Sequence, residues 1–310
     1  MSTITADTAE QIARSADVTI DQSEHTALIL RGKDVSAQIR QDCKSDIAEL
    51  KSRHGILPGL AVVRLGSDPA SVNYAQRIQD SFGRVGVTVT MVELDETVSR
   101  AVFQSELARL NVLPEIAGIL VQQPLPSQID LETIIGSLDP TKDVDGIHPL
   151  NVGRLMLGLD CYVPATPAGG MAILDYYKIP VEGKRALVIG RSGVVGKPLS
   201  QLLLARNATV TVAHSRTTNL PALVAQAEIL AVAVGKPHMI KGDMLRPGSV
   251  VLDFGAAMVN DRMTGDVDYE AALERVGAIT PVPGGTGPVT NAMLLKNTVR
   301  AIRRSLPYTK

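Results

Sequence analysis

The side chains that could do chemistry are few, and they lie close to the ends of predicted strands. The first half of the sequence places a hydroxyl, a phenol, an amide and two carboxylates near strand ends, namely Ser71, Tyr74, Gln122, Asp143 and Asp145. A carboxylate such as Asp145 can accept hydrogen bonds from an amino-pyrimidine edge, and Tyr74 can stack on an aromatic ring. Taken alone, the DVDG sequence around Asp145 is more often a turn than a ligand site, so both interpretations stay open here.

Other catalytic signatures do not occur in the sequence. It has no HExxH, no GxSxG and no protein-kinase motif set. Its two cysteines, Cys43 and Cys161, belong to no CxxC pair and lie near no histidine cluster. We therefore expect no metal site, no disulfide framework and a reducing compartment.

A glycine-rich stretch follows the apolar run at residues 186–189. Its glycines are Gly190, Gly193 and Gly196, and an apolar segment with helical spacing comes next. This pattern is typical of a strand, a tight turn and a helix that together bind a pyrophosphate, since glycine lets the backbone approach a phosphate and the helix start offers free N–H groups. The spacing GxxGxxG departs from the usual GxGxxG fingerprint, so taken alone it fits an ordinary turn equally well.

The end of the next predicted strand, 208–213, indicates which dinucleotide would bind. An NAD-binding unit usually carries an acid there for the ribose hydroxyls, but this sequence continues with His214, Ser215 and Arg216. A hydroxyl and a guanidinium suit a 2′-phosphate, and Arg191 in the glycine turn can reach the same group. The sequence therefore predicts NADP. In the alternative interpretation, both arginines are solvated surface charges.

Composition excludes several classes of protein. The chain has 31 basic and 32 acidic residues and a formal net charge of -1, with no run of like charge to bind nucleic acid. Residues 1–24 are polar and acidic and lack the pattern of a secretory signal, and no 18 apolar residues run together. We expect a soluble cytoplasmic protein without membrane or nucleic-acid partners, and a flexible extension at residues 1–24.

Alternating strand and helix patterns from residue 27 onward predict an α/β fold with mainly parallel sheets. A chain of 310 residues favours two domains. We expect the first at 25–160, completed by a C-terminal helix at 289–310, and the second at 161–288. Strands are predicted at 60–65, 87–94, 116–121, 185–190, 208–213, 229–234 and 249–254, and helices at 34–53, 70–84, 98–110 and 289–304.

Eight stretches, in order along nearly the whole chain after about residue 25, resemble the methylenetetrahydrofolate dehydrogenase/cyclohydrolase family, FolD. They are GSDPASVNY, GILVQQPLP, DPTKDVDGIHPLNVGRL, ATPAGG, VIGRSGVVGKPLSQLL, VTVAHSRT, AVGKP and TPVPGGTGPVT. The resemblance implies a cytoplasmic homodimer in which a folate-binding α/β domain and an NADP-binding Rossmann domain flank a cleft. It also implies oxidation of 5,10-methylenetetrahydrofolate to the 5,10-methenyl form, followed by hydrolysis to 10-formyltetrahydrofolate.

The resemblance also implies individual residue functions. Tyr74 would stack on the folate ring system, Asp145 would hold the pterin edge, and Gln122 would take the position that supports the family's catalytic lysine. The folate side of the cleft would be lined by Pro283, Gly284 and Gly285. The family's NADP-binding motifs would contain Gly190, Arg191, Ser192, Gly193, Gly196, His214, Ser215 and Arg216.

The sequence departs from the family pattern at the catalytic lysine. The family usually reads Y-x-x-x-K, and here Ile78 stands one helical turn after Tyr74. Hydride transfer to nicotinamide moves no proton, whereas opening the methenyl ring does, and losing a placed acid or base typically costs about 10²- to 10⁴-fold. We therefore expect a dehydrogenase with weak or absent cyclohydrolase activity. With the family geometry kept, residue 78 points into the folate cleft and a lysine there restores hydrolysis; in the alternative, the pocket has closed.

Two further hypotheses stay open. A fully bifunctional enzyme would need another lysine, such as Lys142 or Lys296, to reach the cleft. A non-catalytic paralogue that binds folate or dinucleotide would need no reacting groups, although the intact NADP motifs speak against it. Other departures from the family pattern are Ala165, the stretch 253–257 and Thr286.

Overall fold

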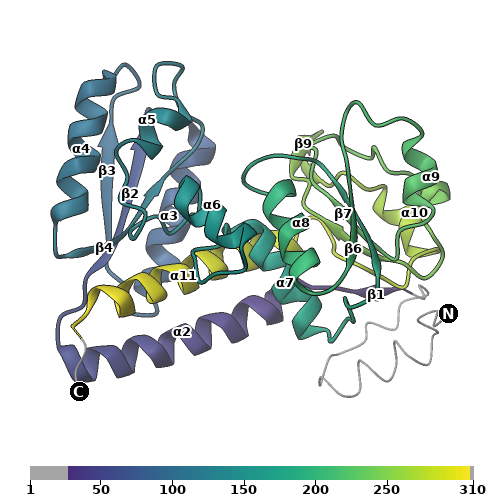
Figure 1. Ribbon diagram of the computed structural model, residues 1–310, viewed down its shortest axis with the longest axis horizontal. Coiled ribbons are helices and arrows are strands. Elements are labelled where there is room, and N and C mark those ends of the chain that lie inside the picture. Colours follow the sequence, from purple (N-terminus) through teal and green to yellow (C-terminus); the bar gives the residue numbers. More distant parts are fainter. Residues whose placement is uncertain (1–26, 308–310) are drawn as a thin grey trace. The chain divides into compact units, whose positions relative to one another are not determined.

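The chain folds into two units, and neither is a continuous stretch of sequence. A computed structural model describes residues 27–307, so the extension expected at residues 1–24 lies outside the described residues. The six-stranded unit consists of residues up to Ala37 and Thr166–Thr290. The three-stranded unit consists of Gln38–Ala165 and Asn291–Lys310. Figure 1 shows the helices and strands of both units.

The six-stranded unit contains a wholly parallel sheet in the order β1-β11-β8-β7-β5-β6. In that order its strands are β1 (Leu28–Ile29), β11 (Ala278–Ile279), β8 (Val250–Asp253), β7 (Ile229–Val232), β5 (Arg185–Ile189) and β6 (Thr209–Ala213). The chain proceeds from β5 to β6 on one side and then to β7 on the other. In open parallel sheets, ligands bind beyond the carboxyl ends of the strands at such a reversal.

Helices cover both faces of this sheet because its buried side chains alternate between the faces. Leu187, Leu230 and Val251 join one cluster with residues of α9 (Leu220–Val224) and α10 (Tyr269–Leu273). On the opposite face, α7 (Ala165–Tyr176) places Gly170 against Leu252. The unit also contains α8 (Gly196–Ala205), the short helix η1 (Gly242–Met244) and a hairpin of β9 (Ala257–Val259) and β10 (Arg262–Thr264).

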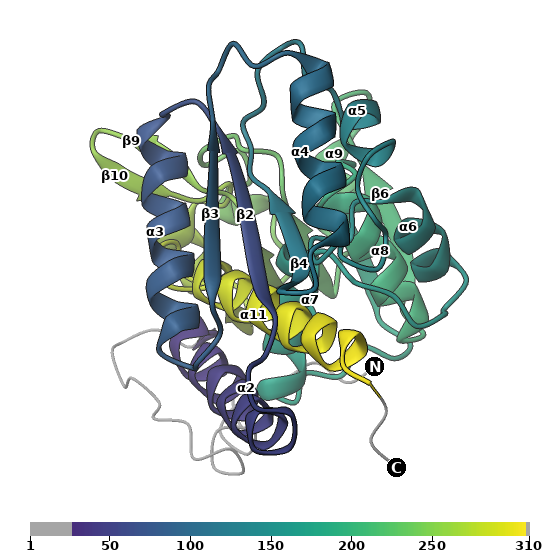
Figure 2. The same ribbon diagram turned by 90° about the vertical axis from the view of Figure 1, so that its left-hand side faces the viewer.

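The three-stranded unit has a parallel sheet in the order β3-β2-β4, formed by β2 (Gly59–Leu65), β3 (Val89–Leu94) and β4 (Ile116–Val121). Alternate side chains of β2 enter two different cores. Ala61 and Val63 pack with α4 (Arg100–Val112) and α5 (Leu131–Ile135), while Leu60 and Val62 pack with α2 (Gly32–His54), α3 (Pro69–Gly83) and α11 (Thr286–Ser305). Figure 2 shows α3 and α4 on opposite sides of these strands. Helix α6 (Pro149–Met156) follows β4 and α5 in the chain.

The structure confirms the predicted α/β fold with parallel sheets, and each predicted strand and helix exists within a few residues of its expected bounds. Helix α7, which was not among the predicted helices, begins at Ala165 in the stretch VPATPAGG. Pro167 is accommodated because the first turn of a helix needs no N–H donors. Among the described residues, no helix is long and apolar enough to cross a membrane.

Candidate functional site

The glycine turn after β5 lies at the carboxyl edge of the six-stranded sheet. Gly190 has φ +120°, and a Cβ there would lie 2.3 Å from the carbonyl oxygen of Ala233. A Cβ on Gly196 would lie 2.1 Å from the carbonyl oxygen of Gly190. In contrast, a Cβ on Gly193 would meet nothing within 4 Å. Packing therefore requires glycine at 190 and 196, while Gly193 borders open space.

The start of α8 offers a place for an anion. Arg191, Ser192 and Gly193 are exposed, and the Ser192 hydroxyl accepts hydrogen bonds from the N–H groups of Val195 at 3.2 Å and Gly196 at 3.4 Å. The serine thereby satisfies the N–H groups of Val195, which precedes the helix, and of Gly196, its first residue. The exposed turn, the close backbone and the positive end of a ten-residue helix together fit a pyrophosphate.

The end of β6 forms a small turn that exposes two side chains. The Thr217 hydroxyl accepts the N–H of His214 at 2.8 Å, and the Nδ1 atom of His214 accepts the N–H of Arg216 at 3.2 Å. His214 thus shapes the turn, whereas Ser215 and Arg216 are exposed. No acidic side chain occurs in the four residues 214–217. The groups that could bind a ribose phosphate there are the hydroxyl of Ser215 and the guanidinium of Arg216.

In the three-stranded unit, the structure brings Ser71 and Gln122 together. Gln122 is 5 % exposed and donates its Nε2–H to the carbonyl oxygen of Ser71 at 2.6 Å. The Ser71 hydroxyl donates to the carbonyl oxygen of Gln123 at 3.1 Å, and its N–H is capped by Asp68 at 2.9 Å. Within residues 27–307, the Gln122 Oε1 atom is buried without a hydrogen-bond partner. An unsatisfied buried acceptor of this kind is costly unless a ligand or water supplies a donor.

Tyr74 and Asp145 also lie near each other. Burial, and then the charge of Asp145, raise the pKa of Tyr74 to about 12. Burial, and then the charge of Asp143, raise the pKa of Asp145 to about 6. No hydrogen bond reaches the Asp145 carboxylate from the part of the chain that the structure describes. The Asp145 carboxylate is therefore held in place by the fold while its oxygens accept no hydrogen bond, as expected for a ligand-binding group.

The turn that carries Asp145 is fixed by its neighbour Asp143. That side chain is fully buried and accepts hydrogen bonds from the N–H groups of Ile147 at 3.2 Å and His148 at 2.9 Å, and from Asn151 Nδ2 at 2.8 Å. The two carboxylates of the DVDG sequence thus have different functions. Asp143 is the structural acid, and Asp145 remains available.

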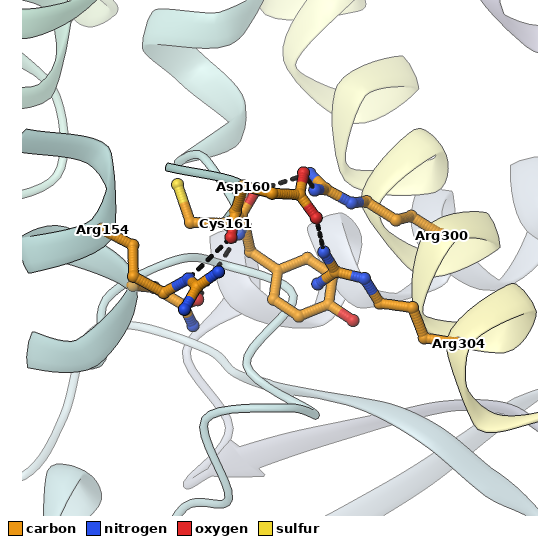
Figure 3. A network of polar contacts seen from close by, with 7 residues as sticks. Arg154, Asp160, Cys161, Arg300 and Arg304 are labelled. Carbon is orange, nitrogen blue, oxygen red and sulfur yellow. Dashed lines mark hydrogen bonds and ion pairs between the residues drawn. The ribbon is translucent and has the colours of Figure 1, made fainter. Parts of the chain in front are cut away.

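A network of arginines from α6 and α11 supports the same region, as Figure 3 shows. Arg300 and Arg304 both form ion pairs with the carboxylate of Asp160, and Arg154 Nε donates to the Asp160 carbonyl oxygen at 2.7 Å. The guanidinium carbons of Arg300 and Arg304 lie 5.6 Å and 5.0 Å from the ring centre of Tyr162, within cation–π range. The carbonyl of Tyr162 lies where a Cβ on residue 146 would collide, at 2.7 Å, so the network positions the turn after Asp145.

Ile78 is 0 % exposed and belongs to the apolar cluster that contains Ala75 and Phe82. Helix α3 thus directs residue 78 into the core, an arrangement that agrees with the closed-pocket alternative rather than with an open cleft. Tyr74, one turn earlier, packs against the same cluster but is only partly buried. Arg77 points to solvent.

The two lysines considered as substitutes have other surroundings. Lys142 Nζ donates to the carbonyl oxygens of Leu110 at 3.1 Å and Leu113 at 2.9 Å, at the end of α4. Lys296 is exposed on α11, where its charge acts on the pKa of Cys43. Burial, the largest cause, raises the pKa of that thiol to about 12, so Cys43 is inert.

The residues 283–285 belong to the six-stranded unit. Pro283 and Gly284 are exposed, while Gly285 is buried and a Cβ there would lie 2.5 Å from the carbonyl oxygen of Pro281. The carbonyl of Gly284 accepts the N–H of Gly32 at 2.8 Å. This turn therefore packs tightly on the start of α2. Within the described chain, no group of three or more His, Cys, Asp or Glu side chains could hold a metal ion.

Two buried acids of the six-stranded unit were not predicted from the sequence. Asp253 is 2 % exposed and Asp266 is 0 % exposed. Both accept hydrogen bonds from backbone N–H groups, which lie after β7, after β8 and after β10. Burial, offset in part by these hydrogen bonds, raises the pKa of Asp253 to about 6. For Asp253 the available signal was its position at the end of the apolar run VVLD, whereas Asp266 follows no such run.

Comparisons with known proteins cover most of the chain. A family model described as tetrahydrofolate dehydrogenase/cyclohydrolase, catalytic domain, matches residues 30–145. A second, tetrahydrofolate dehydrogenase/cyclohydrolase, NAD(P)-binding domain, matches residues 164–306. Among curated proteins, the bifunctional protein FolD of Herpetosiphon aurantiacus is 49 % identical over 277 residues, which is 89 % of this chain and 97 % of the relative. The FolD protein of Moorella thermoacetica is 48 % identical over 279 residues, 90 % and 99 % of the two chains.

Solved structures agree. The bifunctional methylenetetrahydrofolate dehydrogenase/cyclohydrolase of Campylobacter jejuni superposes with a TM-score of 0.88 at 39 % identity, over 90 % of this chain and 100 % of the other. The Trypanosoma brucei enzyme, complexed with NADP cofactor and an inhibitor, superposes with a TM-score of 0.87 at 34 % identity, over 90 % and 98 %. These identities and coverages extend over both units.

Proposed function

The chain belongs to the tetrahydrofolate dehydrogenase/cyclohydrolase family, and we propose that it oxidises 5,10-methylenetetrahydrofolate to the 5,10-methenyl form with NADP and has little or no cyclohydrolase activity. We assign folate binding to the three-stranded unit, which carries Tyr74, Gln122 and Asp145. NADP binding is assigned to the six-stranded unit, which carries the glycine turn and Arg216. The homodimer and the cytoplasmic location that the family resemblance implies are part of the proposal, and light scattering of the purified protein tests the dimer.

The observation that carries the loss of hydrolysis is the side chain of residue 78. Ring opening of the methenyl form needs a group that moves protons near the reacting carbon. Ile78 cannot titrate, and it is fully buried in an apolar cluster. Its neighbour Arg77 is exposed on another face of α3, and a guanidinium remains protonated at neutral pH. Residues 77 and 78 thus supply no general acid or base.

Hydride transfer requires fewer catalytic groups from the protein than hydrolysis of the methenyl form does. Bound NADP supplies the hydride acceptor, and the protein must hold the two carbons within reach. Asp145 would hold the pterin through its amino and ring N–H groups, because its carboxylate has free acceptor capacity. Tyr74 would cover the ring face, and the buried Oε1 of Gln122 would gain the donor that it lacks.

The chain's residues fit NADP. The turn with Gly190 and Gly196 has the close backbone and the helix start that a pyrophosphate needs. Ser215 and Arg216 are exposed at the end of β6, the strand next to β5, and suit a 2′-phosphate. Arg191 is exposed in the turn after β5. These observations support NADP over NAD.

The alternative is a fully bifunctional enzyme, as the curated relatives are named. It would require a lysine to replace the family's catalytic one. Lys142 donates to two backbone carbonyls at the end of α4, and Lys296 is exposed near Cys43. Both arrangements speak against the alternative, and the rate of hydrolysis decides between the two.

The test follows both steps in one reaction. Purified protein is mixed with 5,10-methylenetetrahydrofolate and NADP, and the absorbances of NADPH and of the methenyl product are recorded together. We expect the methenyl form to accumulate in step with NADPH and to decay at the uncatalysed rate. In a separate reaction, methenyltetrahydrofolate alone is supplied with and without protein.

A catalysed loss of the methenyl form in either reaction would refute the missing cyclohydrolase. Absence of NADPH formation, with NADP and folate still bound in equilibrium dialysis, would instead identify a non-catalytic paralogue. Asp145→Ala is the matched variant for folate binding, since it should slow NADPH formation at low folate and leave NADP affinity unchanged.

A further inference from the structure

Two buried carboxylates in the six-stranded unit form a connected clamp. Asp253 ends β8, and Asp266 lies between β10 and α10. Six hydrogen bonds from backbone N–H groups converge on the two side chains. The structure assigns these two acids as positioning residues for NADP, an inference that rests on the proposed function and extends it to the loop after β7.

Asp266 holds that loop directly. Its Oδ2 accepts the N–H groups of Val234 at 2.7 Å and Gly235 at 3.0 Å, and its Oδ1 accepts the N–H of Lys236 at 2.6 Å. Three consecutive N–H groups on one carboxylate form a rigid nest, and hydrogen bonds to a charged acceptor are the strong ones. The loop after β7 therefore has a single conformation imposed from within the protein.

Asp253 holds Asp266 in turn. Its Oδ1 accepts the N–H groups of Gly255 at 2.8 Å and Asp266 at 3.1 Å, and its Oδ2 accepts the N–H of Val267 at 2.9 Å. Two glycines make room for the pair. A Cβ on Gly265 would lie 2.1 Å from Asp253 Oδ2, and a Cβ on Gly255 would lie 2.7 Å from the carboxyl carbon of Asp266. Glycine at positions 255 and 265 is thus required for the clamp to form.

The clamped loop borders the proposed cofactor site. It follows β7, which pairs with β5, and the sheet reverses its direction of progress between these two strands. The carbonyl oxygen of Ala233 lies 2.3 Å from the position of a Cβ on Gly190, so loop and glycine turn are in direct contact. A shift of the loop would alter the space at Gly190.

The clamp also indicates which part of the cofactor this loop meets. The N–H groups of Val234, Gly235 and Lys236 are occupied by Asp266 and cannot serve a phosphate. The pyrophosphate is therefore left to the exposed turn at residues 191–193 and to the positive dipole end of α8.

The test is Asp266→Asn, in the full-length protein, with Asp268→Asn as the matched control. Asp268 lies two residues further along and pairs at the surface with Lys241 at 3.3 Å. Asparagine in place of Asp266 keeps the shape but loses the charge, and it turns an amide N–H toward backbone donors. We expect the Kd for NADP to rise by roughly tenfold or more, because NADP binding would then have to order a loop that the parent protein already holds in place. The Kd for folate and the kcat at saturating NADP should change less than twofold.

A second measurement does not depend on activity. Amide hydrogen exchange in the protein without cofactor should show protection at residues 234–236, and Asp266→Asn should remove it. Should that variant not fold, Asp253→Asn serves instead, since it loosens Asp266 without touching the loop, and the same rise in the Kd for NADP is expected. An unchanged Kd for NADP, or equal losses for NADP and folate, would overturn the inference. Failure of the parent protein to bind NADP would refute the proposed function and leave the exchange result as the separate test of the clamp.

Discussion

Replacing Asp145 by asparagine should make the protein more stable and a weaker folate binder. The pKa of this carboxyl is raised from its ordinary value of 3.8 to about 6, first by burial and then by Asp143. An acid with a raised pKa in the folded state stabilises the fold below pH 3.8, and that contribution is lost as the pH rises through 6. At neutral pH the charge on Asp145 therefore opposes folding, and asparagine removes it.

The magnitude follows from the shift. A difference of about 2 pKa units, at 1.36 kcal/mol each, corresponds to about 3 kcal/mol at pH 8, where Asp145 is ionised in both the folded and the unfolded chain. At pH 5 the same linkage leaves about 1.5 kcal/mol, because the folded protein is then largely protonated. We thus expect Asp145→Asn to raise the free energy of unfolding by up to these amounts, and the gain to shrink as the pH falls.

The assay is urea unfolding followed by circular dichroism at pH 8 and pH 5, together with the Kd for folate at pH 8. Folate affinity should fall by about tenfold to a hundredfold, since the pterin donors lose a charged acceptor. Asp143→Asn is the control: that side chain accepts three hydrogen bonds while fully buried, so its loss should destabilise the fold. Equal stability of parent and Asp145→Asn at pH 8, or a gain that grows at pH 5, would refute the reasoning.

Three further predictions concern the cofactor site and the core. Arg216→Ala should reduce the preference for NADP over NAD, because it should weaken the binding of NADP and leave that of NAD unchanged. Equal Kd values for both dinucleotides in the parent protein would contradict this. Gly196→Ala should lower the melting temperature strongly and Gly193→Ala barely, because only the first places a Cβ against backbone. Ile78→Lys should lose roughly 2–5 kcal/mol of stability relative to Ile78→Met and gain no hydrolysis, since the new amine enters an apolar core without a partner. Catalysed hydrolysis by the folded lysine variant would show that the pocket is open.

Local pattern was enough to predict the parallel strands and the glycine turn. The run at 186–189 and the glycines after it are consecutive in sequence, and their structure follows from short-range sterics. The HSRT turn after β6 was likewise readable, because a strand end is a local feature. Family resemblance then linked Tyr74, Gln122 and Asp145.

Long-range packing was not predictable in the same way. The sequence shows that Ile78 follows Tyr74 by one turn of a helix. Which of the two is buried depends on how α3 packs against the core, and there α3 buries residue 78 and leaves Tyr74 partly exposed. The clamp formed by Asp253 and Asp266 is similar. A carboxylate is fully buried only when backbone donors from distant loops surround it, and no single stretch of sequence shows those donors.

The division of both units along the chain has a consequence for how the protein is made. β1 pairs with β11, roughly 250 residues later, and the core of the three-stranded unit includes Leu294, Leu295 and Ile302 of α11. Chains often fold domain by domain during synthesis, starting from the N-terminus. Here β1 cannot pair until β11 has been made, and the core of the three-stranded unit cannot close until α11 has been made. Until α11 has been made, the apolar faces of α2 and α3 in the three-stranded unit stay uncovered. We expect chaperones that bind such faces to stay on the nascent chain for much of its synthesis.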